Sequence, residues 1–207
     1  MIRTEWRGGL ALLTIDRPDK ANSLTGAMLR DLTAALDETA ARDDCGALIL
    51  TATGKVFSAG ADLAEAKAGL TASPDWERLS GRMATMPCLT IAALNGTLAG
   101  GAFGVALACD LRIAVPEARF FYPVMKLGFL PQPSDPRRLT GLVGPSRARM
   151  ILMAGARIDA AEALSWGLID RIAPAADLIP QAEALAADCL AADPGHVMAI
   201  KAMVGQR

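Results

Sequence analysis

The feature that most constrains the fold is a long stretch without any charged side chain, which runs from Met83 to Cys109. A run of this length is long enough to cross a membrane as a helix. Proline at 87, asparagine at 95 and four glycines at 96, 100, 101 and 104 argue against such a helix. The stretch instead predicts a buried strand over Cys88–Leu94, a glycine-rich turn and a buried helix, so no membrane span is expected.

Short apolar strands alternate with helices along the rest of the chain, which indicates the α/β class. Expected strands are Thr4–Arg7, Leu10–Ile15, Ala47–Thr51, Val56–Ala59, Leu111–Val115, Arg119–Tyr122 and Leu168–Ala173. Expected helices start after Thr25 and Gly60 and span Trp76–Thr85. Prolines at 131, 133 and 136 predict a non-helical loop. We expect a single domain over 1–207, with its core in 1–136 and a mostly helical region in 137–207.

Charge and composition exclude several classes of protein. The 21 Lys and Arg nearly balance the 22 Asp and Glu, and aromatic residues make up only 4% of the chain. Neither a nucleic-acid partner nor a charged membrane surface is therefore expected. The cysteines form no CxxC pair and there is a single histidine, so no metal site is expected. No signal-peptide pattern is seen at the start, and we expect a cytoplasmic protein with reduced thiols.

Two glycine-centred turns are the strongest candidates for a functional site. The first is Phe57–Leu63, FSAGADL, and the second is Asn95–Ala102, NGTLAGGA. In each, a strand is expected to end at a glycine turn from which a helix begins, leaving backbone N–H groups without helical partners. Glycines alone also explain either turn as a tight bend. Two such turns facing each other would form an oxyanion hole for a carbonyl group.

Several stretches in order along nearly the whole chain identify a resemblance. They are RPDKANSL at 17–24, FSAGADL at 57–63, NGTLAGGAFGVALACD at 95–110, LGFLP at 127–131 and the run 155–172. Together they resemble the enoyl-CoA hydratase/isomerase, or crotonase, superfamily. The resemblance implies repeated ββα turns that form a spiral, with a helical C-terminal part. It also implies a homo-oligomer, a trimer or hexamer, that acts in fatty acid metabolism on a coenzyme A thioester and needs no other cofactor.

The same resemblance implies roles for particular residues. The backbone N–H groups of Ala61 and Gly101 would form the oxyanion hole. The residues that it places along the coenzyme A moiety are Lys20, Ala21, Asp62, Leu63 and Ala64. Familiar members continue for roughly another 40–50 residues beyond the position where this sequence ends. From this shorter length we expect a more open pocket, a different assembly or apolar surface that a partner covers.

The sequence departs from the hydratases of the family at two positions. These enzymes carry glutamates where this chain has Gly104 and Val124. Water addition needs one group to activate the water and another to protonate the α-carbon, and neither glycine nor valine can do so. We therefore expect negligible hydration of crotonyl-CoA, and we expect glutamates at the two positions to raise it.

Other polar side chains nearby are candidates for the missing acid and base. Asp135 and Tyr122 are the two that we select, and Gln132 and Lys126 lie close to them in sequence. Each also has a structural interpretation. Asp135 precedes a proline and is typical of a helix cap or turn. Tyr122 is equally explained as a packed aromatic with its hydroxyl at the surface.

Three functions are consistent with these residues. The first is an acyl-CoA lyase or isomerase that stabilises an enolate in the oxyanion hole, and decarboxylation of a malonyl-type thioester fits best because it needs no strong base. The second is a non-catalytic acyl-CoA-binding or scaffold protein, which the pair Gly104 and Val124 favours. The third is a structural partner that no longer binds coenzyme A, which the two intact glycine turns argue against.

Overall fold

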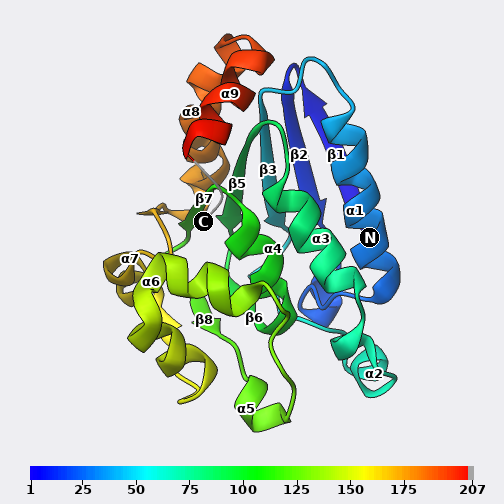
Figure 1. Cartoon of the computed structure of the whole chain (residues 1–207), viewed down its shortest axis with the longest axis vertical. Coiled ribbons are helices and arrows are strands. Elements are labelled where there is room, and N and C mark those ends of the chain that lie inside the picture. The colour runs from blue at the N-terminus through cyan, green and yellow to red at the C-terminus, as the bar shows by residue number, and fades with distance from the viewer. Residues whose placement is uncertain (205–207) are drawn as a thin grey trace.

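Two β-sheets run through the structure, a computed structural model that describes residues 1–204 (Figure 1). The larger sheet has the strand order β1 (Ile2–Arg7), β2 (Leu10–Ile15), β3 (Ala47–Ala52), β5 (Leu89–Leu94), β7 (Leu111–Ala114) and β10 (Arg171–Ile172). The smaller sheet has the order β4 (Val56–Ser58), β6 (Thr97–Ala99), β8 (Arg119–Phe121) and β9 (Ile158–Asp159). Neighbouring strands are parallel except in the pairs β1–β2 and β8–β9.

The chain crosses between the two sheets in a repeating pattern. A strand of the larger sheet is followed at once by a strand of the smaller one in the pairs β3 and β4, β5 and β6, and β7 and β8. Helices follow each of these pairs before the next strand of the larger sheet. This arrangement confirms the expected α/β fold with ββα turns.

Helices cover the sheets and complete the fold. Their bounds are α1 (Gly26–Ala40), α2 (Leu63–Lys67), α3 (Asp75–Ala84), α4 (Phe103–Ala108), α5 (Val124–Leu127), α6 (Asp135–Leu152), α7 (Ala160–Trp166), α8 (Leu178–Ala191) and α9 (Pro194–Val204). Short 3₁₀ helices are η1 (Pro18–Lys20), η2 (Leu70–Ala72), η3 (Gly100–Ala102) and η4 (Ala175–Asp177). In Figure 1, α1, α3 and α4 lie in a row, and α8 packs against β3 and β5. Within residues 1–204, no helix is long and apolar enough to cross a membrane.

The uncharged stretch Met83–Cys109 forms the end of α3, then β5, β6, η3 and α4, and most of it is buried. Strand β3 beside it has every residue buried. A central parallel strand covered on both faces reads as a continuous apolar run, which explains these compositions. Three of the five phenylalanines are fully buried, namely Phe57 of β4, Phe103 of α4 and Phe120 of β8. The core cluster also includes buried residues after 136, such as Leu139, Ile151 and Ala182.

Some predicted boundaries were wrong, each for a local reason. Helix α2 begins at Leu63 instead of directly after Gly60, because the Asp62 side chain caps the helix. The proline-rich loop ends earlier than expected, since α6 begins at Asp135 with Pro136 in its first turn, where proline has no hydrogen bond to lose. The predicted strand over 168–173 shrinks to β10, the two residues that pair with β7.

A buried arginine ties the C-terminal part of the fold to the larger sheet. Arg112 of β7 is 3% exposed, and its guanidinium donates to the carbonyl oxygens of Leu168 at 2.9 Å and Cys109 at 2.7 Å. Its side chain also lies 3.5 Å from the Asp170 carboxylate. A buried cation keeps its charge only when such acceptors replace water. Arg112 thus holds the segment before β10 against β7.

Replacing Arg112 with methionine keeps side-chain length but leaves these buried carbonyl oxygens without a donor. We expect Arg112→Met to lower the free energy of unfolding by about 3 kcal/mol, measured by urea denaturation. Arg119→Met is the control, because Arg119 is an exposed arginine in β8 and should change stability by about 0.5 kcal/mol or less. Equal losses in the two variants would contradict this role for Arg112.

Candidate functional site

A chain of hydrogen bonds through Asn22 fixes the first glycine turn. Asn22 is fully buried, and its amide donates to the carbonyl oxygens of Thr53 at 2.8 Å and Val56 at 2.7 Å. The Ser58 hydroxyl donates to the Asn22 carbonyl oxygen at 2.8 Å and accepts from the Gly60 N–H at 3.1 Å. Every donor in this chain has a buried acceptor, so the backbone around Gly60 is held in one conformation.

The N–H of Ala61 points away from Leu24, the residue whose backbone pairs with this turn. Leu24 donates to the Gly60 carbonyl oxygen at 2.7 Å, and the Asp62 N–H donates to the Leu24 carbonyl oxygen at 2.8 Å. Consecutive residues of an extended chain present their N–H groups to opposite sides. The Ala61 N–H therefore faces the other way, and no hydrogen-bond acceptor for it is found among residues 1–204.

The second turn begins η3 directly after β6. Gly101 lies in the first turn of η3, and the N–H groups of a first turn have no acceptor within their own helix. Gly60 and Gly100 both have positive φ, at 91° and 57°. A Cβ atom added to Gly60 would lie 2.9 Å from the Ala99 carbonyl oxygen and 3.3 Å from the Gly101 nitrogen. The two turns are thus in backbone contact, and only glycine fits at position 60.

Trp76 packs behind the second turn, which the sequence did not reveal. Its side chain is 3% exposed, and its ring lies 3.1 Å from the position of a Cβ atom on Gly101. The indole N–H donates to the Leu70 carbonyl oxygen at 2.9 Å, which fixes the ring. Its only signal in the sequence is its place on the apolar face of the predicted helix 76–85.

The residues expected along coenzyme A gather near the first turn. Ala59 donates to the Ala21 carbonyl oxygen at 3.0 Å, which brings Lys20 and Ala21 beside the turn. Lys20 is exposed, and Ala21 has a left-handed backbone with φ of 49°. Leu63, which follows the turn, is 80% exposed. These residues lie close to the first turn, and the side chains of Lys20 and Leu63 are exposed.

The Asp62 side chain is engaged within the protein. Its Oδ1 accepts from the N–H groups of Ala64 at 3.0 Å and Glu65 at 3.3 Å, and its Oδ2 accepts from Arg17 at 2.8 Å. The hydrogen bond from Arg17 lowers the pKa of Asp62 below its usual range. Asp62 and the exposed Ala64 therefore offer a ligand mainly their backbone and Cβ surfaces.

Asp135 and Tyr122 form a buried pair. Asp135 is 1% exposed and Tyr122 4% exposed, and the tyrosine hydroxyl donates to Asp135 Oδ2 at 2.9 Å. The ring of Tyr122 stacks on Phe103 with centroids 5.4 Å apart. The structural interpretations offered by the sequence hold in part, since Tyr122 is a packed aromatic and Asp135 lies in the first turn of α6. The Tyr122 hydroxyl is not at the surface, and the Asp135 carboxyl does not cap α6, whose N-cap residue is Ser134.

The other oxygen of this carboxyl, Oδ1, is buried without a hydrogen-bond partner in the described part of the chain. Burial raises the pKa of Asp135 to about 7 against the opposing effects of the Tyr122 hydrogen bond and the Arg138 charge, and Glu77 raises it further. Burial and the neighbouring Asp135 charge also raise the pKa of Tyr122. A carboxyl with this pKa exists in both protonation states near neutral pH.

The Asp135 carboxyl lies against the first of the two positions where the family glutamates are missing. A Cβ atom added to Gly104 would lie 2.9 Å from Asp135 Oδ1. A side chain can therefore be introduced at 104 only if Asp135 moves. Val124, at the second position, begins α5 and is 7% exposed. Its buried aliphatic side chain offers no proton donor or acceptor.

The remaining polar candidates lie elsewhere or have other partners. The Gln132 side chain donates to the Thr71 carbonyl oxygen at 3.0 Å, and its backbone N–H lies 3.4 Å from the Tyr122 hydroxyl. Lys126 and His196 are exposed. In the part of the chain described, no group of three or more potential metal ligands is found.

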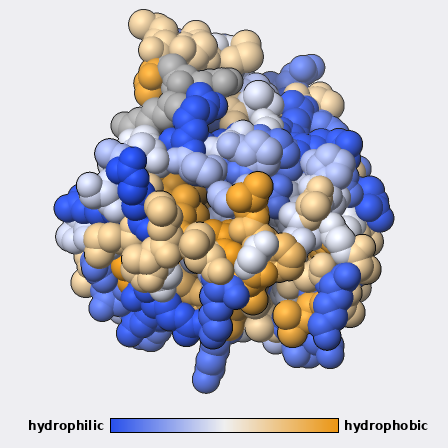
Figure 2. All heavy atoms as spheres, turned by 60° about the horizontal axis from the view of Figure 1, so that its bottom comes forward, coloured by the Kyte–Doolittle hydropathy of each residue, from blue (hydrophilic) through white to orange (hydrophobic). Residues whose placement is uncertain are grey.

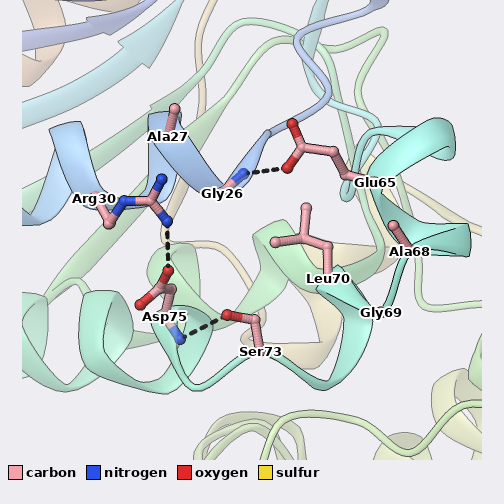
Figure 3. A pocket seen from close by; sticks show the side chains of 9 residues that line it. All are labelled: Gly26, Ala27, Arg30, Glu65, Ala68, Gly69, Leu70, Ser73 and Asp75. Carbon is pink, nitrogen blue, oxygen red and sulfur yellow. Dashed lines mark hydrogen bonds and ion pairs between the residues drawn. The ribbon is translucent and has the colours of Figure 1, made fainter.

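An open cavity of about 420 Å³ lies where α1, α2, η2 and α3 meet (Figure 3). Its charged groups are bound to the protein, because Arg30 pairs with Asp75 at 3.1 Å and Glu65 accepts from the Gly26 N–H at 2.7 Å. Leu70 lines this cavity, and its carbonyl oxygen accepts the hydrogen bond from the Trp76 indole N–H. Ala61, Gly101, Tyr122 and Asp135 are not among the residues that line it.

The two-sheet spiral with its pair of contacting glycine turns is the crotonase fold. The chain belongs to the enoyl-CoA hydratase/isomerase family, whose model matches residues 5–207. It is 38% identical over 181 residues to a protein named probable enoyl-CoA hydratase echA8 from Mycobacterium leprae, which covers 86% of this chain and 70% of that protein. Members of the family act on coenzyme A thioesters without a separate cofactor.

Solved structures show the same likeness. An enoyl-CoA hydratase from Bacillus anthracis superimposes with a TM-score of 0.91 at 30% identity, covering 98% of this chain and 81% of that chain. DspI of Pseudomonas aeruginosa superimposes with a TM-score of 0.91 at 32% identity, covering 98% and 79%. These matches confirm the family that the sequence motifs indicated.

The buried carboxyl makes stability depend on pH. Because the pKa of Asp135 is raised on folding, the cost of burying its negative charge is absent below about pH 4, where the carboxyl is protonated. The cost grows as pH rises from there through about 7, and the fold loses stability over this range. The difference between these pKa values corresponds to a penalty on the order of 4 kcal/mol. We expect Asp135→Asn to be more stable than the natural chain at pH 8, with the advantage shrinking toward pH 5.

Urea denaturation at the two pH values measures this effect. Asp31→Asn is the matched control, because Asp31 is an exposed carboxylate in α1 and its removal should alter stability by about 0.5 kcal/mol or less at both pH values. A difference between Asp135→Asn and the natural chain that stays constant with pH would refute the assignment.

Proposed function

We propose that this protein binds an acyl-CoA thioester and stabilises its enolate with the backbone N–H groups of Ala61 and Gly101. The observation that carries the proposal is the contact between the two turns, which brings the Gly60 backbone within reach of the Gly101 nitrogen. An enolate of a thioester carries its negative charge on the former carbonyl oxygen. Fixed donors aimed at such an oxygen are worth about 3–4 kcal/mol each in the transition state.

The reaction is of a lyase or isomerase type instead of a two-glutamate hydration. Gly104 and Val124 supply no carboxylate, so no pair of groups is present to activate water and protonate carbon in the hydratase manner. Decarboxylation of a malonyl-type thioester suits the site because the substrate supplies its own leaving group. The bond from the α-carbon to the carboxylate breaks, carbon dioxide leaves, and the electron pair moves onto the thioester oxygen.

Residues at the rim of the first turn would hold the rest of the substrate. Exposed Lys20 would pair with a phosphate of the nucleotide end, and Ala21 follows it in the chain. Asp62, Leu63 and Ala64 would line the path of the pantetheine chain, with Leu63 offering an exposed apolar surface. The acyl group would then point inward, past Gly101.

We also propose that this chain forms a homo-oligomer and acts in fatty acid metabolism in the cytoplasm. The face at which α5 and α2 lie carries apolar side chains near its centre (Figure 2). Met125, Leu127, Phe129 and Leu130 of this region are 63%, 58%, 42% and 87% exposed. Apolar side chains gathered in this way favour contact with another protein surface, and sedimentation analysis of the purified chain would give the number of copies.

The alternative is a non-catalytic acyl-CoA-binding or scaffold protein with the same fold, favoured by the two missing glutamates. Calorimetry with acetyl-CoA and crotonyl-CoA, followed by mass spectrometry of thioesters incubated with the protein, separates the two functions. We expect both thioesters to bind, a malonyl-type thioester to lose the mass of carbon dioxide, and crotonyl-CoA to gain water at a negligible rate. Binding without any product would favour the alternative, and rapid hydration of crotonyl-CoA would contradict both.

The oxyanion hole itself is tested by infrared spectroscopy of acetyl-CoA labelled with ¹³C at the carbonyl. Hydrogen bonds from two N–H groups should lower the carbonyl stretching frequency of the bound thioester. We expect Gly60→Ala to abolish this shift, because its Cβ would collide with the Ala99 carbonyl oxygen and force the turns apart. Gly69→Ala is the matched control, since Gly69 also has a positive φ, 101°, but its Cβ would meet nothing within 4 Å. Equal effects of the two variants would count against the hole.

A further inference from the structure

The Asp135 carboxyl is the one titratable group near the site whose burial the fold does not explain. Its Oδ2 is bound by Tyr122, but its Oδ1 is buried without a hydrogen bond within residues 1–204. A buried polar atom without a partner costs about 1–3 kcal/mol and is rare in stable folds. An atom of this kind is typical of a group that meets a ligand.

Gly104 lies between Asp135 Oδ1 and the proposed oxyanion hole along the chain that leads from Gly101. Oδ1 lies 2.9 Å from the place of a Cβ atom on Gly104. Gly104 follows Gly101 by three residues through η3 and the start of α4, which corresponds to less than one helical turn of about 5.4 Å pitch. A thioester whose carbonyl oxygen is held at Gly101 would therefore begin its acyl chain beside the segment that leads to Gly104 and the Asp135 carboxyl.

We propose that Asp135 is the catalytic residue that transfers protons to and from the acyl chain of the bound thioester, in the space of the glutamate absent at 104, and that Tyr122 is its positioning residue. The inference rests on the proposed acyl-CoA function of the same site. The inference assigns to Asp135 the carboxyl group that hydratases of the family carry at position 104. The carboxyl reaches the space from the first turn of α6 instead of from α4.

The proton balance of the step is simple. After loss of carbon dioxide, the enolate carbon takes the proton of the Asp135 carboxylic acid, a C–H bond forms, and the carboxylate recovers a proton from water. In double-bond migration, ionised Asp135 removes a proton from the γ-carbon and returns it to the α-carbon. With acetyl-CoA alone, the carboxylate removes an α-proton, the electron pair moves to the thioester oxygen, and a solvent proton returns.

The surroundings of Asp135 suit a group that both gives and takes protons. Tyr122 donates to it from the segment after β8. The other charges that act on it are Arg138 on α6, which is held by a hydrogen bond of 2.9 Å to the Ser80 hydroxyl, and Glu77 on α3, which bonds to Ser134. Because burial outweighs the donor and the cation, the pKa is about 7. Acid–base catalysis is most efficient when the pKa lies near the working pH.

Exchange of the α-hydrogens of acetyl-CoA with deuterium oxide tests the proposal, with mass spectrometry as the readout. We expect the natural protein to catalyse exchange, with a rate that rises with pH through an inflection near pH 7. Asp135→Asn should lower the exchange rate by about 100-fold or more, while acetyl-CoA affinity by calorimetry changes less than about threefold. Exchange by Asp135→Asn at the natural rate would overturn the proposal, as would affinity and exchange that fall together.

Tyr122→Phe separates positioning from structure. Loss of the hydroxyl removes a donor that lowers the pKa of Asp135, so the inflection of the exchange profile should move to higher pH while exchange persists. A profile with an unchanged inflection would refute the positioning role. A protein that exchanges no α-hydrogen but still shows the shifted carbonyl frequency would overturn the role of Asp135 and leave the oxyanion hole standing.

Moving the carboxyl from position 135 to position 104 gives a test that measures a gain of activity instead of a loss. In the double variant Gly104→Glu with Asp135→Gly, the removed carboxyl makes room for the new side chain. We expect its exchange rate to exceed that of Asp135→Gly alone by about tenfold or more. Gly104→Gln with Asp135→Gly is the matched control of equal size without the acid, and it should show no recovery. Equal rates in the two double variants would argue that no proton carrier acts in this space.

Discussion

The site depends on a close contact between two stretches of backbone. Gly60 lies so near the Ala99 carbonyl oxygen and the Gly101 nitrogen that a single added methyl group would separate the turns. Parallel pairing of β4 with β6 sets this contact, because both turns leave the same end of neighbouring strands. The buried Asn22 and Ser58 then hold the first turn from behind, and Trp76 supports the second. Two N–H groups can be fixed in space in this way without any functional side chain.

A site whose donors belong to the backbone leaves its acid–base group free to come from elsewhere. The proposed oxyanion hole would constrain the glycines at 60 and 101, but it would place no requirement on which element supplies a carboxyl. Here the carboxyl comes from the first turn of α6, where the helix dipole favours a negative charge and burial opposes it. Burial raises the pKa of Asp135 to about 7 against the opposing effects of the Tyr122 hydrogen bond and the Arg138 charge.

The sequence predicts the features that local chemistry determines. The uncharged run and the glycines in it are sufficient to predict β5, the turn and α4, and the glycine turns were predicted for the same reason. The pairing of Tyr122 with Asp135 was not predictable, because thirteen residues separate them and α5 and a loop intervene. Asp135 preceding Pro136 is typical of a surface cap, and only the packing of α6 against α4 shows that its side chain is buried beside Gly104. Tertiary contacts decide such positions, and residue type alone does not.

The unpartnered oxygen of Asp135 bears on the choice between the proposed enzyme and the alternative of a non-catalytic binding protein. A site without selection for chemistry would be expected to fill the space beside Gly104 with an apolar side chain, since an unpartnered buried carboxyl oxygen destabilises the fold. Instead, position 104 is a glycine, and the space that a side chain there would fill is occupied by the Asp135 carboxyl from α6. A side chain at 104 and the Asp135 carboxyl in its present position would compete for the same space, because a Cβ atom at 104 would lie 2.9 Å from Asp135 Oδ1. Under the proposed function, the carboxyl from α6 would serve the acyl chain in the space that a side chain at 104 would otherwise fill.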